Sequence, residues 1–175
     1  MRRALTLHPD SVCQAVTRIE VDVAHEGAGA LVLHYAVTGQ IGDLRLPPVT
    51  TPARADGLWQ HTCFEVFVRS AAETAYYEFN FAPSTQWAVY RFDNYRSGMR
   101  VAAEVSVSRI EVQSAPERYT LEATLDLSRG KGAGWRLGLS AVIEEANGQK
   151  SYWALAHPPG KADFHHADCF AYEFS

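Results

Sequence analysis

The sequence contains few cysteines, and none of them is spaced as in a metal-binding or redox motif. Cys13, Cys63 and Cys169 are an odd number, and no two of them form a C-x-x-C pair. A disulfide framework needs paired cysteines, and a chain of 175 residues can bury a core without such crosslinks. We therefore expect a reducing compartment, and so a cytoplasmic location.

Long apolar runs and an excess of basic residues are also missing. No segment approaches the roughly 20 apolar residues of a membrane helix, and the start, MRRALTLHPDSVC, has no apolar stretch behind its two arginines. The formal net charge is -4, which provides no basic field to attract a phosphate backbone. The sequence thus predicts a soluble, unexported protein without a membrane or nucleic-acid partner, and it leaves the oligomeric state open.

Familiar catalytic motifs are absent as well. No G-x-S-x-G segment occurs, and GKGAG lacks the spacing and the Lys-Ser/Thr end of a phosphate loop. Glu65 and Glu78 could act as a catalytic carboxylate pair only at a suitable separation, which the sequence does not define. We therefore favour a non-catalytic binding protein, with an enzyme of unknown reaction as an alternative.

Alternation of apolar and polar residues with a period of two dominates the chain. Such alternation is typical of strands with one buried and one solvent-facing side. The runs lie at 31–37, 101–107, 119–127 and 135–143. Turn signals lie between runs, at 26–29, 38–43, 82–84, 129–134 and 146–148. About ten short strands arranged in this way predict an all-β fold, namely an antiparallel, jelly-roll-like β-sandwich forming a single domain over residues 1–175.

The segment LWQHTCFEVFVRS, residues 58–70, has a glutamate in the middle of an otherwise apolar strand. Alternation places Glu65 on the face opposite the apolar series. The next run, AYYEFNF, places Glu78 and Asn80 in the same way, and the run TQWAVYRF adds Arg91. If these strands form a meander, the four side chains gather beside aromatic rings, as in a polar ligand site. The same pattern also allows an ordinary solvated face.

These residues resemble a known family. Trp59 and Glu65 in WQHTCFEVFV are similar to the W-x-x-D-x-V-E-I-F-I-D segment of family nine carbohydrate-binding modules and of the related DOMON β-sandwiches. The motifs WQHTCFE, YYEFNFAP, YWALAHP and DFH resemble those of small bacterial DOMON-like proteins. The resemblance covers most of the chain from Trp59 onward. It implies a module that binds a carbohydrate or a similar hydroxylated small molecule.

The resemblance also implies which residues bind the ligand. In the sugar-binding relatives two aromatic rings clamp a terminal sugar, and acidic and amide side chains bind its hydroxyls. Trp59 stands at the place of the first ring and Phe164 at that of the second. The full set of candidates is Trp59, Glu65, Glu78, Asn80, Arg91, Phe164 and His165. The sequence departs from the family at Thr62, where an aspartate is usual, at Glu78, where a basic residue is usual, and at Phe164, where a tryptophan is usual.

Two alternatives involve a cofactor. The haem-binding branch of these sandwiches uses a methionine and a histidine as axial ligands, and the methionines here are Met1 and Met99. A zinc or iron ion could instead bind to side chains in or near HPPGKADFHHADC. The candidates are His61, His157, His165, His166 and Cys169. They lack the spacing of a defined metal motif, and such histidines also commonly pair with buried backbone groups. We expect no cofactor, with haem or a zinc or iron ion as the alternative.

Overall fold

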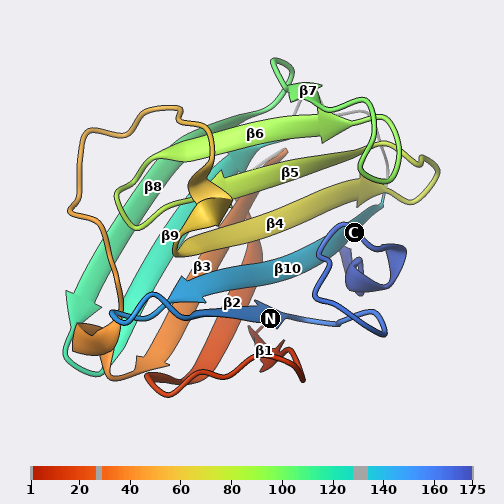
Figure 1. Cartoon of the computed structure of the whole chain (residues 1–175). Helices are drawn as coiled ribbons and strands as arrows, with labels where there is room; N and C mark the ends of the chain where they lie inside the picture. Colours follow the sequence, from red (N-terminus) through yellow and green to blue (C-terminus); the bar gives the residue numbers. More distant parts are fainter. Residues whose placement is uncertain (1, 27–28, 128–133, 175) are drawn as a thin grey trace.

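The computed structural model describes residues 2–26, 29–127 and 134–174, and strands account for most of its regular structure (Figure 1). The strands are β1 (Arg2–Leu7), β2 (Val16–Glu26), β3 (Ala30–Gly39), β4 (Cys63–Ser70), β5 (Tyr76–Phe81), β6 (Trp87–Phe92), β7 (Arg100–Val101), β8 (Ser106–Ala115), β9 (Arg118–Asp126), β10 (Trp135–Glu144), β11 (Lys150–Ala154) and β12 (Tyr172–Phe174). Short 3-10 helices occur at η1 (Ile41–Asp43), η2 (Leu58–Gln60) and η3 (Ala167–Cys169). Within these ranges, no helix is long and apolar enough to cross a membrane. The all-β prediction is confirmed.

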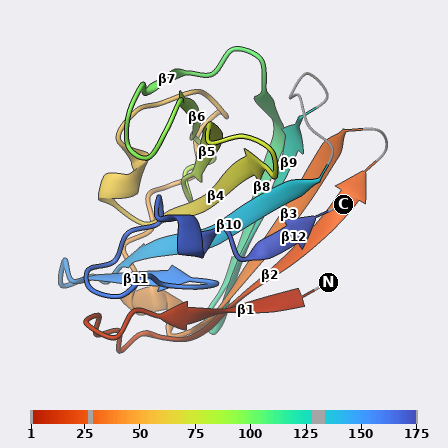
Figure 2. The same cartoon turned by 90° about the vertical axis from the view of Figure 1, so that its right-hand side faces the viewer.

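The strands form one curled sheet in the order β7-β6-β5-β4-β10-β11-β1-β2-β3-β9-β8, with β12 paired to β10. Neighbouring strands are antiparallel throughout this order. The sheet folds over so that two layers pack against each other (Figures 1 and 2). The front layer contains β7, β6, β5, β4, β10, β11 and β12, and the back layer contains β1, β2, β3, β9 and β8. Strand β1 joins the layers, because Arg2–Leu5 pairs with β2 and Thr6–Leu7 with β11. The antiparallel β-sandwich is confirmed, and its jelly-roll character stays a prediction.

The sequence runs match the strands with one exception. The run at 101–107 is divided between β7, which ends at Val101, and β8, which begins at Ser106. Here the chain passes from the front layer to the back layer, so its alternation does not belong to one strand. The turn signals at 82–84 and 146–148 connect β5 to β6 and β10 to β11. Those at 26–29 and 129–134, with GKGAG, lie largely outside the described residues.

The main core lies between the two layers. On β4 it receives Phe64, Val66 and Val68, the side chains that alternation assigned to the apolar face. They pack among buried residues of the back layer such as Leu33 and Leu121. Each such side chain contributes roughly 1.5 to 3 kcal/mol when fully buried. This burial fixes the strand register, and therefore also fixes which side chains of β4 and β5 point the other way.

The outer face of the front layer carries a second apolar cluster. Its buried members are Phe67, Tyr76, Ala88, Tyr90, Phe92, Val142, Ala154, Phe164 and Phe170. The C-terminal segment supplies Phe164 and Phe170, and Phe67 makes edge contacts with the rings of His165 and Phe170. Strands β4 and β5 are consequently buried on both faces. The ordinary solvated face, which the alternation also allowed, is therefore not what surrounds Glu65.

Candidate ligand-binding site

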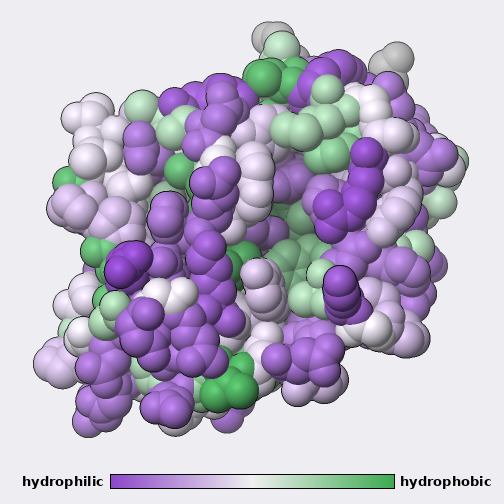
Figure 3. All heavy atoms as spheres, in the orientation of Figure 1, coloured by the Kyte–Doolittle hydropathy of each residue, from purple (hydrophilic) through white to green (hydrophobic). Residues whose placement is uncertain are grey.

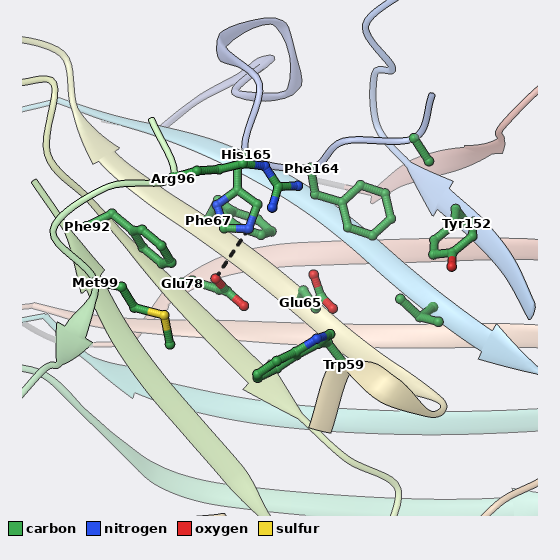
Figure 4. A pocket seen from close by; sticks show the side chains of 12 residues that line it. Trp59, Glu65, Phe67, Glu78, Phe92, Arg96, Met99, Tyr152, Phe164 and His165 are labelled. Carbon is green, nitrogen blue, oxygen red and sulfur yellow. Dashed lines mark ion pairs between the residues drawn. The ribbon is translucent and has the colours of Figure 1, made fainter. Parts of the chain in front are cut away.

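A cavity of about 400 Å³ opens on the outer face of the front layer. It lies over β4 and β5, between η2 and the C-terminal segment (Figure 4). The space-filling view shows a hollow near the middle of this face, bordered by both hydrophilic and hydrophobic residues (Figure 3). The lining residues are Trp59, Glu65, Phe67, Glu78, Phe92, Arg96, Met99, Val142, Tyr152, Ala162, Phe164 and His165. The volume lies within the roughly 300 to 1,000 Å³ that small-molecule sites usually occupy.

Two glutamates from neighbouring strands lie at the floor of the cavity. The register pairs Glu65 with Asn80 and Phe67 with Glu78, so both glutamates are on the same face, one diagonal step apart. Glu65 is 3% exposed and Glu78 is 6% exposed. Asn80 lies beside them, fully buried, and its Nδ2 donates a hydrogen bond of 2.8 Å to Oε1 of Glu78.

The carboxyl group of Glu65 has no hydrogen-bond or ion-pair partner within the described part of the chain, and it faces the cavity (Figure 4). Its neighbour on β10, Ser140, has a buried hydroxyl that also lacks a partner among the described residues. Burial, and then the charge of Glu78, raise the pKa of Glu65 well above its ordinary value. Burial also raises the pKa of Glu78, against the effect of the Asn80 hydrogen bond. Because two close carboxyl groups do not ionise independently, the second of the pair loses its proton less readily than the first.

His165 faces the cavity in a defined, neutral form. The Tyr76 hydroxyl accepts a hydrogen bond from the backbone N–H of Arg96 at 3.2 Å and lies 2.7 Å from Nδ1 of His165. The tautomer with its proton on Nε2 suits both neighbours, because it directs the N–H toward an oxygen of Glu78 and lets Nδ1 accept from Tyr76. Nε2 then carries the ring proton and points toward Oε2 of Glu78 at 3.6 Å (Figure 4). Burial, and then the charge of Arg96, lower the pKa of His165 to about 4. At neutral pH this imidazole is therefore an uncharged hydrogen-bond donor toward the cavity.

Arg96 reaches the cavity from the turn after β6. Its backbone is in the left-handed region, with φ of 48°, which is uncommon for a residue with a side chain. The guanidinium is held by Asp163, whose Oδ1 lies 2.8 Å from one nitrogen and 3.3 Å from another. Asp163 also accepts hydrogen bonds from the hydroxyl of Tyr95 and from the backbone N–H of His165. The charge of Arg96 is thus balanced by a partner from the C-terminal segment.

Aromatic rings form the walls of the cavity. Trp59 projects from η2 and is 42% exposed, and Phe164 lies across the cavity from it (Figure 4). Gly57 precedes η2 with φ of 74°, a conformation that glycine adopts without strain. The rings of Trp59 and Tyr90 form a T-shaped contact, with ring centroids 6.3 Å apart. The rings leave a space in which a flat apolar surface could stack.

Most of the residues predicted for the site meet in this cavity. Trp59, Glu65, Glu78, Phe164 and His165 line it, and Asn80 supports Glu78 from beside the floor. Their role in ligand binding stays a prediction.

The placement of Arg91 with these residues is wrong. Arg91 pairs with Tyr77 across β5 and β6 and lies on the opposite face of the sheet, near Glu104 at 3.4 Å. It is an odd-numbered residue of β6, like the buried core residue Val89, so its parity places it away from Glu78.

Several lining residues are not among those predicted for the site. They include Phe92, Arg96 and Tyr152. Phe92 lies on the same face of β6 as Tyr90, so parity could have identified it. Arg96 belongs to a turn, and no local pattern indicates that its partner is Asp163.

The metal-ligand candidates are dispersed. His61 contacts a carboxylate, His157 and Cys169 contact backbone carbonyls, and His166 accepts from a backbone amide. Over residues 2–26, 29–127 and 134–174, no group of three His, Cys, Asp or Glu side chains is placed to hold a metal ion.

Comparison with known proteins identifies the fold but not a family. No protein-family model matches the chain, and no curated protein matches it. One similar crystal structure is that of a protein from Bacteroides uniformis that is proposed to bind carbohydrate. The alignment spans 97% of this chain and 83% of that protein's chain, with a TM-score of 0.63 and 15% sequence identity. A second is a family 9 carbohydrate-binding module from Caldicellulosiruptor kristjanssonii, solved with glucose. Here the alignment spans 86% of this chain and 72% of the module's chain, with a TM-score of 0.46 and 15% sequence identity. The first likeness shows a shared fold, and the second TM-score is too low to establish one. The relation to DOMON proteins stays a prediction.

The burial of Glu65 has a consequence for stability. Because folding raises its pKa, the folded protein loses stability as the pH rises from the ordinary value of 4.5 through the raised value. Glu65→Gln keeps the shape but cannot ionise. In urea titrations it is expected to be more stable than the native protein by up to about 3 kcal/mol above neutral pH, with no gain at pH 4 or below.

Glu104 provides a control of opposite sign. Burial alone would raise the pKa of Glu104. Hydrogen bonds from backbone N–H groups and from Arg100 outweigh burial, however, and lower this pKa to about 2. Glu104→Gln is therefore expected to lose stability at neutral pH, and the difference should disappear as the pH falls to 2. A pH-independent effect of Glu65→Gln would contradict this account.

Proposed function

We propose that this protein binds a hydroxylated small molecule, with a terminal sugar as the simplest case, in the cavity between Trp59 and Phe164. The observation that carries the proposal is the Glu65 carboxyl group, which is buried, faces the cavity and has no partner among the described residues. A ligand hydroxyl in the cavity provides the missing partner, so binding accounts for a residue that folding alone disfavours.

The polar groups around the cavity suit vicinal hydroxyls. Both carboxyl groups accept hydrogen bonds, the one that holds a proton also donates, and Nε2–H of His165 donates. A sugar hydroxyl is itself both donor and acceptor, so it matches each of these groups.

The apolar walls suit the rest of a sugar. The C–H face of a pyranose stacks on an aromatic ring such as that of Trp59, and Phe164 closes the opposite side. The resemblance of WQHTCFE and DFH to sugar-binding sandwiches supports the same assignment. The shared fold with a protein proposed to bind carbohydrate agrees with it. The proposal assigns no catalysis to the site.

The contacts of His165 argue against the haem alternative. Met99 and His165 both line the cavity, as that alternative requires. However, Nδ1 of His165 is occupied by the Tyr76 hydroxyl, and Nε2 faces Glu78 at only 3.6 Å. A haem iron bound to Nε2 would place the porphyrin in the 3.6 Å gap between Nε2 and Glu78, next to a carboxylate. We therefore do not propose haem binding.

A glycan array followed by calorimetry tests the proposed function. At least one sugar is expected to bind with one site per chain, and Glu78→Gln is expected to weaken it by about 1.5 to 3 kcal/mol, as for hydrogen bonds to charged groups. Arg91→Ala is the matched control, since it removes a charged side chain from the opposite face and should leave binding unchanged. Absence of any binding sugar, or equal effects of the two substitutions, would contradict the proposal.

A further inference from the structure

The acidic groups of the cavity have no matching positive charge in contact with them. Glu65 and Glu78 are both more than nine-tenths buried. Within the described residues, Glu65 has no hydrogen-bond partner, and Glu78 accepts its hydrogen bond from the neutral amide of Asn80. Burying two carboxyl groups side by side is unfavourable unless a cation or a proton compensates them.

The two basic side chains at the cavity do not supply that cation. His165 is uncharged at neutral pH, because its pKa is lowered to about 4, first by burial and then by Arg96. The guanidinium of Arg96 is bound to Asp163 through two nitrogens, at 2.8 and 3.3 Å. Arg96 lowers the pKa of Glu78 at a distance but forms no ion pair with it. The other titratable groups that interact with Glu65 or Glu78 are the neutral side chains of Tyr35, Cys63, Tyr76 and Tyr90, whose pKa values are all raised.

We propose that the ligand carries a protonated amino group that binds between Glu65 and Glu78, so that the ligand class is an amino sugar or a similar hydroxylated amine. This inference rests on the proposed function and names the ligand of the same site. An ammonium group has three N–H donors and a positive charge, so it can bond to both carboxyl groups and replace the proton that the pair otherwise holds.

The surroundings of the two carboxyl groups favour an ammonium over a metal ion. A metal ion needs several ligands in a fixed geometry, and no group of three suitable side chains is placed to hold one in the described ranges. An ammonium group needs only acceptors, and it also gains from an aromatic face such as that of Trp59, which lines the same cavity. The hydroxyls of the ligand would remain for His165 and the cavity rim.

Calorimetry with three matched series of sugars tests this inference. Each series contains a neutral sugar, its 2-amino form and its N-acetylated form, with glucose, galactose and mannose as the parents. In a series that binds, the amine is expected to bind at least about tenfold more tightly than the other two, as one hydrogen bond between charged groups would give. The hydroxyl of the neutral sugar is similar in size to the ammonium group, so this comparison separates charge from shape, and the N-acetyl form shows whether an uncharged nitrogen is sufficient.

Variants show whether the preference arises from the acidic pair. Glu65→Gln leaves Glu78 as the single carboxylate, so it is expected to lower the ratio of amine to neutral-sugar affinity by about tenfold, whereas Arg91→Ala should leave that ratio unchanged. A neutral sugar that binds as tightly as its amine, or an unchanged ratio in Glu65→Gln, would overturn the inference and leave the proposed function standing. If no member of any series binds and the glycan array is also negative, both fail.

Discussion

Trp59→Ala is expected to abolish measurable ligand binding while leaving the free energy of unfolding almost unchanged. Trp59 supplies an exposed wall of the cavity, and its substitution removes the ring on which an apolar ligand face would stack. Aromatic residues at the centre of a binding site commonly lose about 2 to 4 kcal/mol of binding free energy on truncation, or roughly 30- to 700-fold in affinity. Trp59 is 42% exposed and belongs to neither apolar cluster, so its loss should cost the core little.

Two variants serve as controls for this result. Trp59→Phe keeps an aromatic ring and should retain part of the affinity. Val49→Ala changes another apolar side chain, 63% exposed and outside the cavity, and should not affect binding. Affinity is measured by calorimetry and stability by urea denaturation. Full binding by Trp59→Ala would show that the ligand lies elsewhere, and unfolding of this variant would show that the tryptophan is structural.

Asn80→Ala is expected to destabilise the folded protein by about 3 to 5 kcal/mol near neutral pH. Asn80 is fully buried and donates the 2.8 Å hydrogen bond to Glu78. Its removal leaves a buried carboxylate without this donor, which is the situation in which breaking a buried polar pair has its largest effect. The loss should diminish as the pH falls, because a protonated Glu78 no longer carries an uncompensated charge.

A double substitution separates the charge from the packing. Glu78→Gln combined with Asn80→Ala is expected to recover part of the stability lost by Asn80→Ala, because a neutral amide is less costly to bury than a carboxylate. Urea denaturation at several pH values measures both effects. If the double variant is no more stable than Asn80→Ala, then Asn80 acts through packing alone.

The sequence predicts the floor of the site because strand parity is local. Phe64 and Val66 belong to the core face, so Glu65 between them must point outward, and the same reasoning applies to Glu78 between Tyr77 and Phe79. Once the apolar faces are buried, a register shift of one residue would expose them all. This constraint brings Glu65 and Glu78 to one face without further information. Arg91 was wrongly grouped with these residues, because the prediction followed its residue type. Its position in β6 places it on the same face as the core residue Val89.

The side chains that cover the floor of the site, Arg96, Phe164 and His165, could not be predicted in the same way. Phe164 and His165 are about a hundred residues from Glu65 along the chain, and only the family resemblance indicated their place. The pair of Arg96 and Asp163 joins a turn to the C-terminal segment, and such long-range contacts leave no periodic signal. The burial of Glu65, on which both proposals depend, follows from this cover. It is therefore a finding of the structure.

The indole N–H signals of the four tryptophans provide the most direct test of the cavity as the binding site. Trp59 lines the cavity, whereas Trp87, Trp135 and Trp153 pack against the core between the layers. Each indole gives a separate cross-peak in a nitrogen–proton correlation spectrum, recorded while a sugar that binds is added. The expected result is a shift of the Trp59 signal, with the other three unchanged. Movement of any of those three with a stationary Trp59 signal would contradict binding in this cavity.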